Sequence, residues 1–419
     1  MQVSARAQAF VDRHARRNFL AVLAMISSYN GATAFIYGAT VLSVYASHLT
    51  DSATLIGLIP AIQTVGMYLP QLLMVRRIQC LPRKHPFVLR WAIPERLPYL
   101  LIGLSILLWP EAAAGTSYGI LVVGLIIATW AGGILNPAIM SMMATIVRPG
   151  RRGVLFGVSN ALGGLLGALA ALVVRKVLGA YPFPQAYGVL FLLSFAAELV
   201  CYAAVALIRE PPEPLTPLPP PGTAFWSRIP ELWSSRPDFR RFLLARVVLT
   251  LGTMGTAFYV LYGRQRFGIG DAFTGNLTLA GLLGQAVTVP IMGALGDRIG
   301  HRPLVVMGAL MVAAALLIVL LAPSAGWLYA AFALALSGAT TVGVCSSAIN
   351  LSLFTPTELP AYGAIGSTMM GIAMVLAPVI GGWLVDGPGY GALFAAALVA
   401  NLLGAGLFRW GLGRLQIDH

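Results

Sequence analysis

Long apolar runs dominate the chain, and each is separated from the next by a short segment that carries charged or turn-forming residues. A helix needs about 20 consecutive apolar residues to cross a hydrocarbon core of about 30 Å, and runs of that length recur along the whole sequence. The chain is 58% hydrophobic and 10% charged, whereas soluble domains are about 25% charged. Because backbone groups inside a bilayer must bond within their own segment, these runs predict helices, and the chain is expected to be an all-α membrane protein.

The runs predict twelve transmembrane helices, six on each side of a central break. The expected bounds are 19–47, 54–75, 87–109, 117–147, 153–174 and 186–208, followed by 242–262, 272–295, 303–322, 327–354, 363–385 and 391–410. The break begins with seven prolines in fourteen residues, which is typical of an extended linker, and the FWSRIPELW segment after it predicts a short interfacial helix. The expected organisation is therefore an N-terminal bundle (1–208), a cytoplasmic linker (209–241) and a C-terminal bundle (242–419).

The basic residues predict the orientation in the membrane. With the N-terminus inside, nearly all arginines lie at cytoplasmic ends of the spans, and only Arg175, Lys176, Arg264 and Arg266 lie outside. This positive-inside bias predicts a multi-pass protein of a bacterial inner membrane with both termini in the cytoplasm. The net charge of +13 is then explained by helix ends that face anionic lipid, and a nucleic-acid partner is not expected.

The residues that usually carry enzymatic chemistry show no pattern. Cys80, Cys201 and Cys345 are far apart, and no metal-ligand spacing, paired catalytic carboxylates, nucleophile elbow or phosphate loop is present in the sequence. An enzyme, a metal site and a cofactor are therefore not expected.

One loop concentrates the charge of the second half: GALGDRIGHRP, residues 293–303. Its spacing resembles the signature loop of the major facilitator superfamily of membrane transporters. The residues that fall on the motif are Gly293, Asp297, Arg298, Gly300 and Arg302. The resemblance implies two pseudo-symmetric six-helix bundles that give alternating access to a site near the midplane.

The resemblance also implies a gate at the cytoplasmic side. Asp297 is expected to lie near the start of the fifth span, close to Arg152, where a helix N-terminus and an arginine both favour a carboxylate. The loop between the second and third spans, MVRRIQCLPRKHP, has neither the Asp nor the glycines of the motif. We therefore expect swapped charges there, with Glu358 pairing with Arg76 or Arg77; the alternative is that Glu358 is a solvated loop acid.

In the family, the first, fourth, seventh and tenth helices line the cavity, and all four carry polar or aromatic residues at spacings of three and four. The candidate cavity residues are Asn30, Thr33, Tyr37, Asn136, Thr256, Tyr259, Ser347 and Asn350. The alternative is close helix packing through small residues and interhelical hydrogen bonds. These stripes have no fixed acid at their centre, which favours a neutral or amphiphilic solute over a cation.

Two acids, Glu95 and Glu198, lie inside predicted spans and are the candidates for proton coupling. Arg90 or Arg96 can neutralise Glu95, which favours a structural ion pair near the cytoplasmic face. Glu198 has no partner within one helical turn, so it reaches another helix, is protonated in place, or carries the coupled proton.

Together these features predict a monomeric, alternating-access secondary transporter of a small neutral or amphiphilic organic solute. One alternative is a proton-coupled drug exporter, although the fifth span, NALGGLLGALAAL, has the glycines but not the proline of the drug-antiporter pattern. An alternative from another class is a sensor or lipid scramblase on the same fold, which would not transport a solute.

Overall fold

The computed structural model describes residues 5–79, 81–211, 234, 236–353 and 359–411. Helices make up nearly all of this part of the chain, and it contains no strand. Twelve helical segments are long and apolar enough to cross a membrane, and their bounds lie close to those expected from the sequence. The predicted all-α fold with twelve spans is therefore confirmed. Most of the Pro-rich segment and the predicted interfacial helix lie outside the described residues.

Contacts between Cα atoms divide the chain into two compact units. Unit 1 consists of Met1–Tyr37 and Ile62–Pro221, and unit 2 consists of Gly38–Ala61 and Gly222–His419. The short stretch Gly38–Ala61 precedes the central break in the sequence, yet it packs with helices of the second half. The loop between the first two spans is therefore part of unit 2.

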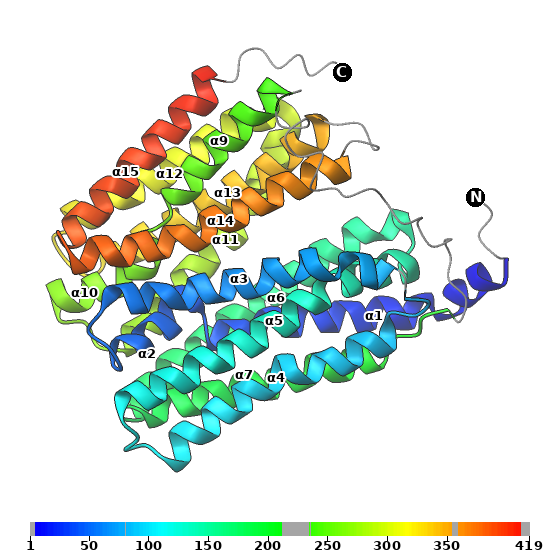
Figure 1. Cartoon of the computed structure of the whole chain (residues 1–419), viewed down its shortest axis with the longest axis horizontal. Coiled ribbons are helices and arrows are strands. Elements are labelled where there is room, and N and C mark those ends of the chain that lie inside the picture. The colour runs from blue at the N-terminus through cyan, green and yellow to red at the C-terminus, as the bar shows by residue number, and fades with distance from the viewer. Residues whose placement is uncertain (1–4, 80, 212–233, 235, 354–358, 412–419) are drawn as a thin grey trace. The chain divides into compact units, whose positions relative to one another are not determined.

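Unit 1 is a bundle of long helices, coloured blue to green in Figure 1. Its helices are α1 (Ala5–Phe35), most of α3 (Ala53–Gln79), α4 (His85–Leu108), α5 (Ala114–Ile146), α6 (Pro149–Ala180) and α7 (Gln185–Ala206). Helix α1 packs against α6 and α7, and α4 packs against α5 and α7. A core that includes the fully buried Val22, Leu135 and Ile208 fills the space between them.

Unit 2 contains the remaining helices. They are η1 (Gly38–Leu42), α2 (Ser43–Ser47), α9 (Pro237–Leu251), η3 (Thr256–Phe258), α10 (Tyr259–Phe267), α11 (Ala272–Ile299), α12 (His301–Leu321), α13 (Trp327–Leu353), α14 (Leu359–Asp386), α15 (Tyr390–Gly406) and η4 (Leu407–Gly411). Helix α13 packs against α11 and α12, and Figure 1 shows α9 running beside α15. The core between them includes the aromatic pair Phe242 and Phe408.

The first and the seventh spans are each broken within their length. The first passes from α1 through the π-helical η1 into α2, and the seventh passes from α9 through Gly252 and η3 into α10. At the second break Asn401 of α15 donates from Nδ2 to the Gly252 carbonyl at 2.7 Å. A side chain from a neighbouring helix thus satisfies the backbone where the helix breaks, as a bilayer requires.

Candidate functional site

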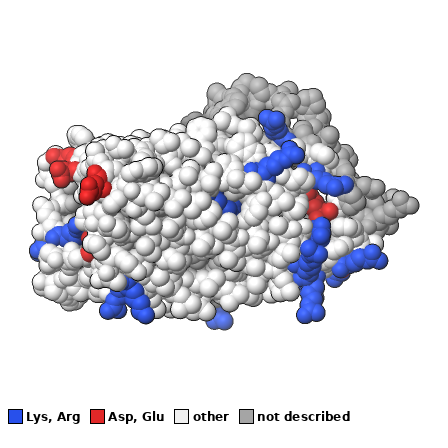
Figure 2. Space-filling model, turned by 90° about the horizontal axis from the view of Figure 1, so that it is seen from below, with Lys and Arg blue, Asp and Glu red and all other residues white. Residues whose placement is uncertain are grey.

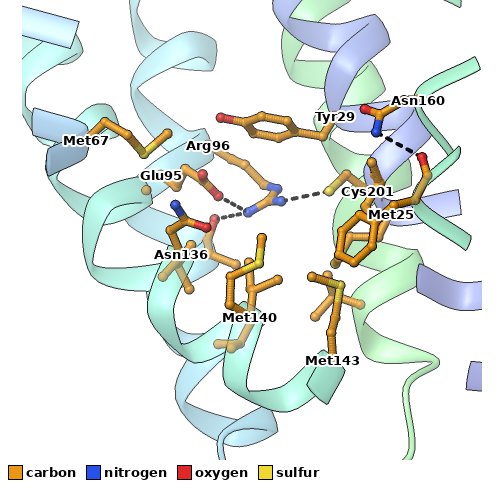
Figure 3. Close-up of a pocket in the computed structure, with 18 residues that line it drawn as sticks. Met25, Tyr29, Met67, Glu95, Arg96, Asn136, Met140, Met143, Asn160 and Cys201 are labelled. Carbon is orange, nitrogen blue, oxygen red and sulfur yellow. Dashed lines mark hydrogen bonds and ion pairs between the residues drawn. The ribbon is translucent and has the colours of Figure 1, made fainter. Parts of the chain in front are cut away.

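A cavity of about 330 Å³ lies inside unit 1 between α1, α3, α4, α5, α6 and α7 (Figure 3). Its lining residues are Met25, Ile26, Tyr29, Met67, Val88, Ala92, Glu95, Arg96, Gly132, Leu135, Asn136, Ile139, Met140, Met143, Phe156, Asn160, Cys201 and Val205. We call it the transport cavity below, after the role that we propose for it. Its volume is at the lower end of the range of pockets that bind small organic molecules, about 300 to 1,000 Å³.

Three charged side chains form a buried cluster in its wall. The Arg96 guanidinium lies 2.7 Å from the carboxylate of Glu95, the preceding residue on α4, and 3.2 Å from that of Glu198 on α7. The three residues are only 8%, 5% and 2% exposed, in the order Glu95, Arg96, Glu198. One guanidinium thus joins two carboxylates from two helices, and we call this group the charged cluster.

Backbone and sulfur contacts hold the guanidinium in place. Arg96 donates to the Ala92 carbonyl at 2.9 Å, to the Glu198 carbonyl at 3.0 Å and to Cys201 Sγ at 3.2 Å. Its Cζ atom also lies 5.8 Å from the centroid of the Tyr202 ring. Figure 3 shows the guanidinium between Glu95 and Cys201. With nearly all of its donors engaged, Arg96 is a fixed positive charge.

The two carboxylates are not equivalent. Glu95 accepts a direct hydrogen bond from Arg96, whereas Glu198 Oε2 is within ion-pair distance of Arg96 but accepts no hydrogen bond of good geometry from a described residue. With both acids ionised the charged cluster carries one negative charge, and with one acid protonated it is neutral. An intramembrane group whose charge can change in this way is a candidate for ion or substrate coupling.

The rest of the transport-cavity wall consists mainly of flexible apolar side chains, together with the amides of two asparagines. Four methionines, Met25, Met67, Met140 and Met143, line the transport cavity together with two aromatic side chains. Methionine is unbranched and polarizable, so it adapts to ligands of different shape. Asn136 and Asn160 add hydrogen-bonding groups, and Asn30 Nδ2 lies 3.5 Å from Asn160 Oδ1.

The structure brings some of the predicted residues together. Of the predicted cavity residues, Asn136 lines the transport cavity and Asn30 lies beside Asn160; the two acids predicted for proton coupling belong to the charged cluster. Thr33 donates its hydroxyl to the Asn30 carbonyl one turn earlier on α1. Tyr37 is the last residue of the first stretch of unit 1 and is half-buried.

The predicted cavity residues of the second half lie in unit 2. Thr256 donates to the Thr253 carbonyl, and the exposed Ser347 donates to the Gly343 carbonyl, so each hydroxyl bonds to its own helical segment. Tyr259 is 1% exposed and packs between the rings of Phe332 and Phe394 in the core of unit 2. The Asn350 side chain lies outside the described part of the chain.

The signature loop forms the turn between α11 and α12. Gly300 separates the two helices. Its φ is +86°, a backbone conformation that residues other than glycine rarely adopt. Arg302 donates to the carbonyls of Phe408 and Arg409 at 3.1 and 2.8 Å, so it caps the end of the last span. Arg298 is exposed in the last turn of α11.

The remaining gate residues are described only in part. In unit 1, Arg152 donates to the carbonyls of Ala144 and Val147 at the end of α5, and Arg77 is exposed near the end of α3. The side chains of Asp297 and Arg76, the surroundings of Gly293 and the whole of Glu358 lie outside the described part of the chain. The pairings predicted for the gate therefore stay predictions.

Sequence reasoning missed a second polar cluster, at the end of α2 in the Gly38–Ala61 stretch of unit 2. Asp271 accepts from His48 Nε2 at 2.8 Å and lies 3.4 Å from Arg264, whose guanidinium also donates to Ser47 at 3.2 Å. Thr40 and Thr278 hydroxyls lie 2.6 Å apart in the same unit. Nothing in the spacing of these residues indicates that they meet, because they come from segments more than 200 positions apart. Among the described residues, no group of three or more metal-ligand side chains is found.

In the second half of the sequence, residues 242–416 match the family model of the Major Facilitator Superfamily. This half of the chain is therefore similar to the major facilitator superfamily of membrane transporters. Because this is a superfamily of membrane transporters, the match indicates a transporter rather than an enzyme. No curated protein sequence matches the chain.

Solved structures extend the fold to the whole chain. The human organic anion transporter MFSD10 (TETRAN) has a TM-score of 0.64 at 16% identity, with 94% of this chain and 99% of that one covered. A bacterial homologue of the iron transporter ferroportin in an inward-facing state has a TM-score of 0.70 at 13% identity, covering 95% and 98%. A mutant form of the nucleoside transporter NupG has a TM-score of 0.71 at 10% identity, covering 94% and 98%. Since their names point to three different kinds of substrate, the substrate of this chain must be argued from its own residues.

Proposed function

We propose that the protein is an alternating-access secondary transporter that carries a small amphiphilic organic solute, and that the transport cavity of unit 1 forms part of its binding site. The observation that carries the proposal is a cavity of about 330 Å³ with an apolar, methionine-rich wall and a buried charged cluster. Pockets of this kind orient an apolar ligand through a few well-placed polar groups. The excess of arginine at one side of the predicted spans supports an orientation with both termini in the cytoplasm of a bacterium.

The wall favours a solute with a compact apolar body and one polar end. Methionine and aromatic side chains make apolar contacts that do not require a particular orientation of the ligand. The amides of Asn136 and Asn160 can each donate and accept a hydrogen bond. The charged cluster offers one guanidinium to two carboxylates. A neutral hydrogen-bonding group or a weak base at the polar end of the solute is thus compatible with the cluster, whereas an anion would face an excess of carboxylate.

Proton coupling is the second part of the proposal. Glu198 is 2% exposed, and only one guanidinium serves both carboxylates. A proton taken up by Glu198 removes the excess negative charge of the cluster, and its release restores it. This supports Glu198 as the coupling residue and Glu95 as the acid that holds Arg96 in place. If the direction is outward, the protein is a proton-coupled exporter.

The gate at the signature loop is kept in the proposal as predicted from the sequence. Asp297 would pair near the start of α6, where Arg152 lies, and Glu358 would pair with Arg76 or Arg77. The support is that the turn of the motif is formed with Gly300 at positive φ and with Arg302 bound to the end of the last span.

A blocking substitution tests the transport cavity. Purified protein is reconstituted in proteoliposomes, and uptake of three fluorescent probes is measured: a lipophilic cation, a neutral amphiphile and an organic anion of similar size. Met140→Trp should block uptake of the accepted probe by adding bulk to the wall, whereas Ile127→Trp should not. Ile127 is the matched control because it is on the same helix and similarly exposed, 47% against 49% for Met140, and it does not line the cavity.

The uptake results distinguish a solute transporter that uses this cavity from the alternatives. Uptake of a probe that stops in Met140→Trp and persists in Ile127→Trp supports the proposal. Uptake that is the same in both variants shows that the substrate binds elsewhere. A protein that moves fluorescent phosphatidylcholine between leaflets but takes up none of the three probes is a scramblase, and the proposed function is then wrong.

A further inference from the structure

A second cavity in unit 1 lies where α3 ends and α4 begins, and the proposed transport cycle does not use it. Its volume is about 610 Å³, and none of its lining residues lines the transport cavity. The end of α3, residues 81–83 and the first two turns of α4 form its wall. This is the segment in which the first half departs from the signature loop, since arginines stand there in place of the acid and glycines.

The wall combines a basic rim with an apolar floor. Arg77, Arg83 and Arg90 line the cavity and are all exposed, whereas Phe87 and Trp91 are half-buried. The two aromatic rings are one turn apart on α4, with centroids 6.2 Å from each other. Guanidinium groups therefore lie beside a continuous aromatic surface, and none of the described residues that line the cavity is acidic.

Among the residues that the structure describes, no neighbouring acid neutralises Arg77 or Arg90. Glu210 is engaged at the N-terminus of α4, where its carboxylate accepts from the backbone N–H groups of Lys84 and His85 at 2.8 Å each. Within the same described part of the chain, Arg77 and Arg90 form no ion pair. The cavity therefore presents net positive charge.

The position along the helices matches the depth of lipid headgroups. The cavity lies at the junction of two predicted spans, at the end of the bundle where the sequence gathers its arginines. On the face that Figure 2 draws, Lys and Arg lie toward both ends and more of them toward one end, while the band between is largely uncharged. Aromatic side chains at this level are typical of the border between headgroups and acyl chains.

We propose that this cavity binds an anionic phospholipid through its phosphate groups, with the acyl region against Phe87 and Trp91. The planar fork of arginine matches phosphate oxygens, and basic pockets between transmembrane helices hold such headgroups. Three arginines around a cavity of this size fit a lipid with two phosphodiesters, such as cardiolipin, better than one with a single phosphate. The aromatic floor would have no role in binding a free phosphate ion.

The experiment uses the purified full-length protein in detergent. Binding of cardiolipin, phosphatidylglycerol and phosphatidylcholine is followed by native mass spectrometry and by the shift in melting temperature. Arg77→Gln/Arg90→Gln should weaken cardiolipin binding about twenty-five-fold, since each of the two arginines near a lipid surface contributes roughly a fivefold factor. Arg175→Gln/Lys176→Gln removes the same charge from two exposed residues at the far end of α6 and should leave binding unchanged.

Two further arms keep the proposal falsifiable. If the glutamine pair fails to fold, two other variants test the site. Arg77→Lys/Arg90→Lys keeps the charge but removes the planar guanidinium fork, and Trp91→Leu removes one of the two aromatic rings of the cavity floor. Each variant should bind cardiolipin more weakly than the wild type does. Equal loss in the control pair, or no loss in any cavity variant, overturns the proposal. Stabilisation by inorganic phosphate or glycerol phosphate to the same extent as by cardiolipin shows a site for a soluble anion, which also overturns it.

Discussion

Asp386, the last residue of α14, caps the N-terminus of α3 through Thr54. Its Oδ2 atom accepts from the backbone N–H of Thr54 at 2.8 Å and from the Thr54 hydroxyl at 2.6 Å, while Oδ1 accepts from the N–H of Ala53 at 2.6 Å. The two residues are 332 positions apart in the sequence and belong to the same unit. A carboxylate that binds the first free N–H groups of a helix stabilises the helix through hydrogen bonds and through its dipole. The second span thus begins at an acid that the eleventh span supplies.

Replacing this cap should loosen the start of α3. Asp386→Ala is expected to cost about 1 kcal/mol locally, which corresponds to about fivefold faster opening of the first turn. Hydrogen–deuterium exchange of the amides in the first turn of α3 measures this. The matched control is Asp51→Ala, because Asp51 is also exposed and lies in the loop just before α3. Equal exchange in the two variants would show that the cap contributes nothing.

Asp271 is expected to be the residue that holds α2 to the start of α11. Its carboxylate contacts both His48 and Arg264, so Asp271→Asn weakens two charged contacts at once. We expect faster exchange in α2 and greater reactivity of a cysteine introduced at Ser47. His48→Gln should have a smaller effect, because Asp271 still contacts Arg264, whose guanidinium donates to Ser47 of α2. A larger effect from His48→Gln than from Asp271→Asn would contradict this order.

Gly338 of α13 should tolerate no larger side chain, because it packs directly against α12. A Cβ atom on Gly338 would lie 2.5 Å from the carbonyl oxygen of Gly308, so the two helices would have to move apart. Gly338→Ala is expected to destabilise the protein by about 1–3 kcal/mol, as overpacking does. Gly343→Ala on the same helix is the control, since a Cβ atom there meets nothing within 4 Å. Thermal unfolding in detergent compares the two, and equal melting temperatures would refute the prediction.

The sequence predicted the twelve spans because the length of an apolar run depends only on the thickness of the bilayer. The sequence could not predict which residues of other helices pack against a given helix face. Tyr259 lies on a polar stripe of the seventh span, yet Phe332 and Phe394 enclose it in the core. The spacing of a helix shows that residues share a face, but the partner of that face is set by tertiary packing.

The charged cluster shows the same limit. Glu95 and Arg96 are neighbours in the sequence, so a local ion pair was predictable. Glu198 is 102 positions from Arg96, and its ion pair depends on how α4 packs against α7. Two methionines of the transport cavity, Met140 and Met143, follow Asn136 at spacings of four and three on the fourth span and so share its face. Nothing in the sequence separates the other two, Met25 and Met67, from methionines in a core.

Arg96 should be far more important for stability than either acid. Arg96→Met leaves two buried carboxylates without their cation, and removing one partner of a buried ion pair costs about 3–5 kcal/mol. Glu198→Gln leaves the Arg96–Glu95 pair intact and should cost much less. In the triple variant Glu95→Gln/Arg96→Met/Glu198→Gln, most of the lost stability should return, because no unpaired charge remains. Melting temperatures that rank the single Arg96 variant no lower than Glu198→Gln would contradict this account.

Glu198 is the residue on which we expect proton coupling to depend. It is the most deeply buried acid of the cluster, and its carboxylate shares one guanidinium with Glu95, so a single proton switches the cluster between one negative charge and none. Glu198→Gln fixes the neutral state. We expect this variant to lose accumulation of substrate driven by a pH gradient in proteoliposomes, while exchange of substrate at equal pH continues, because exchange needs no change of charge. Glu111→Gln in the loop after α4 is the control, since this acid is exposed and outside the spans. A Glu198→Gln variant that still concentrates substrate against a gradient would show that the proton is carried by another residue or that the transporter is not proton-coupled.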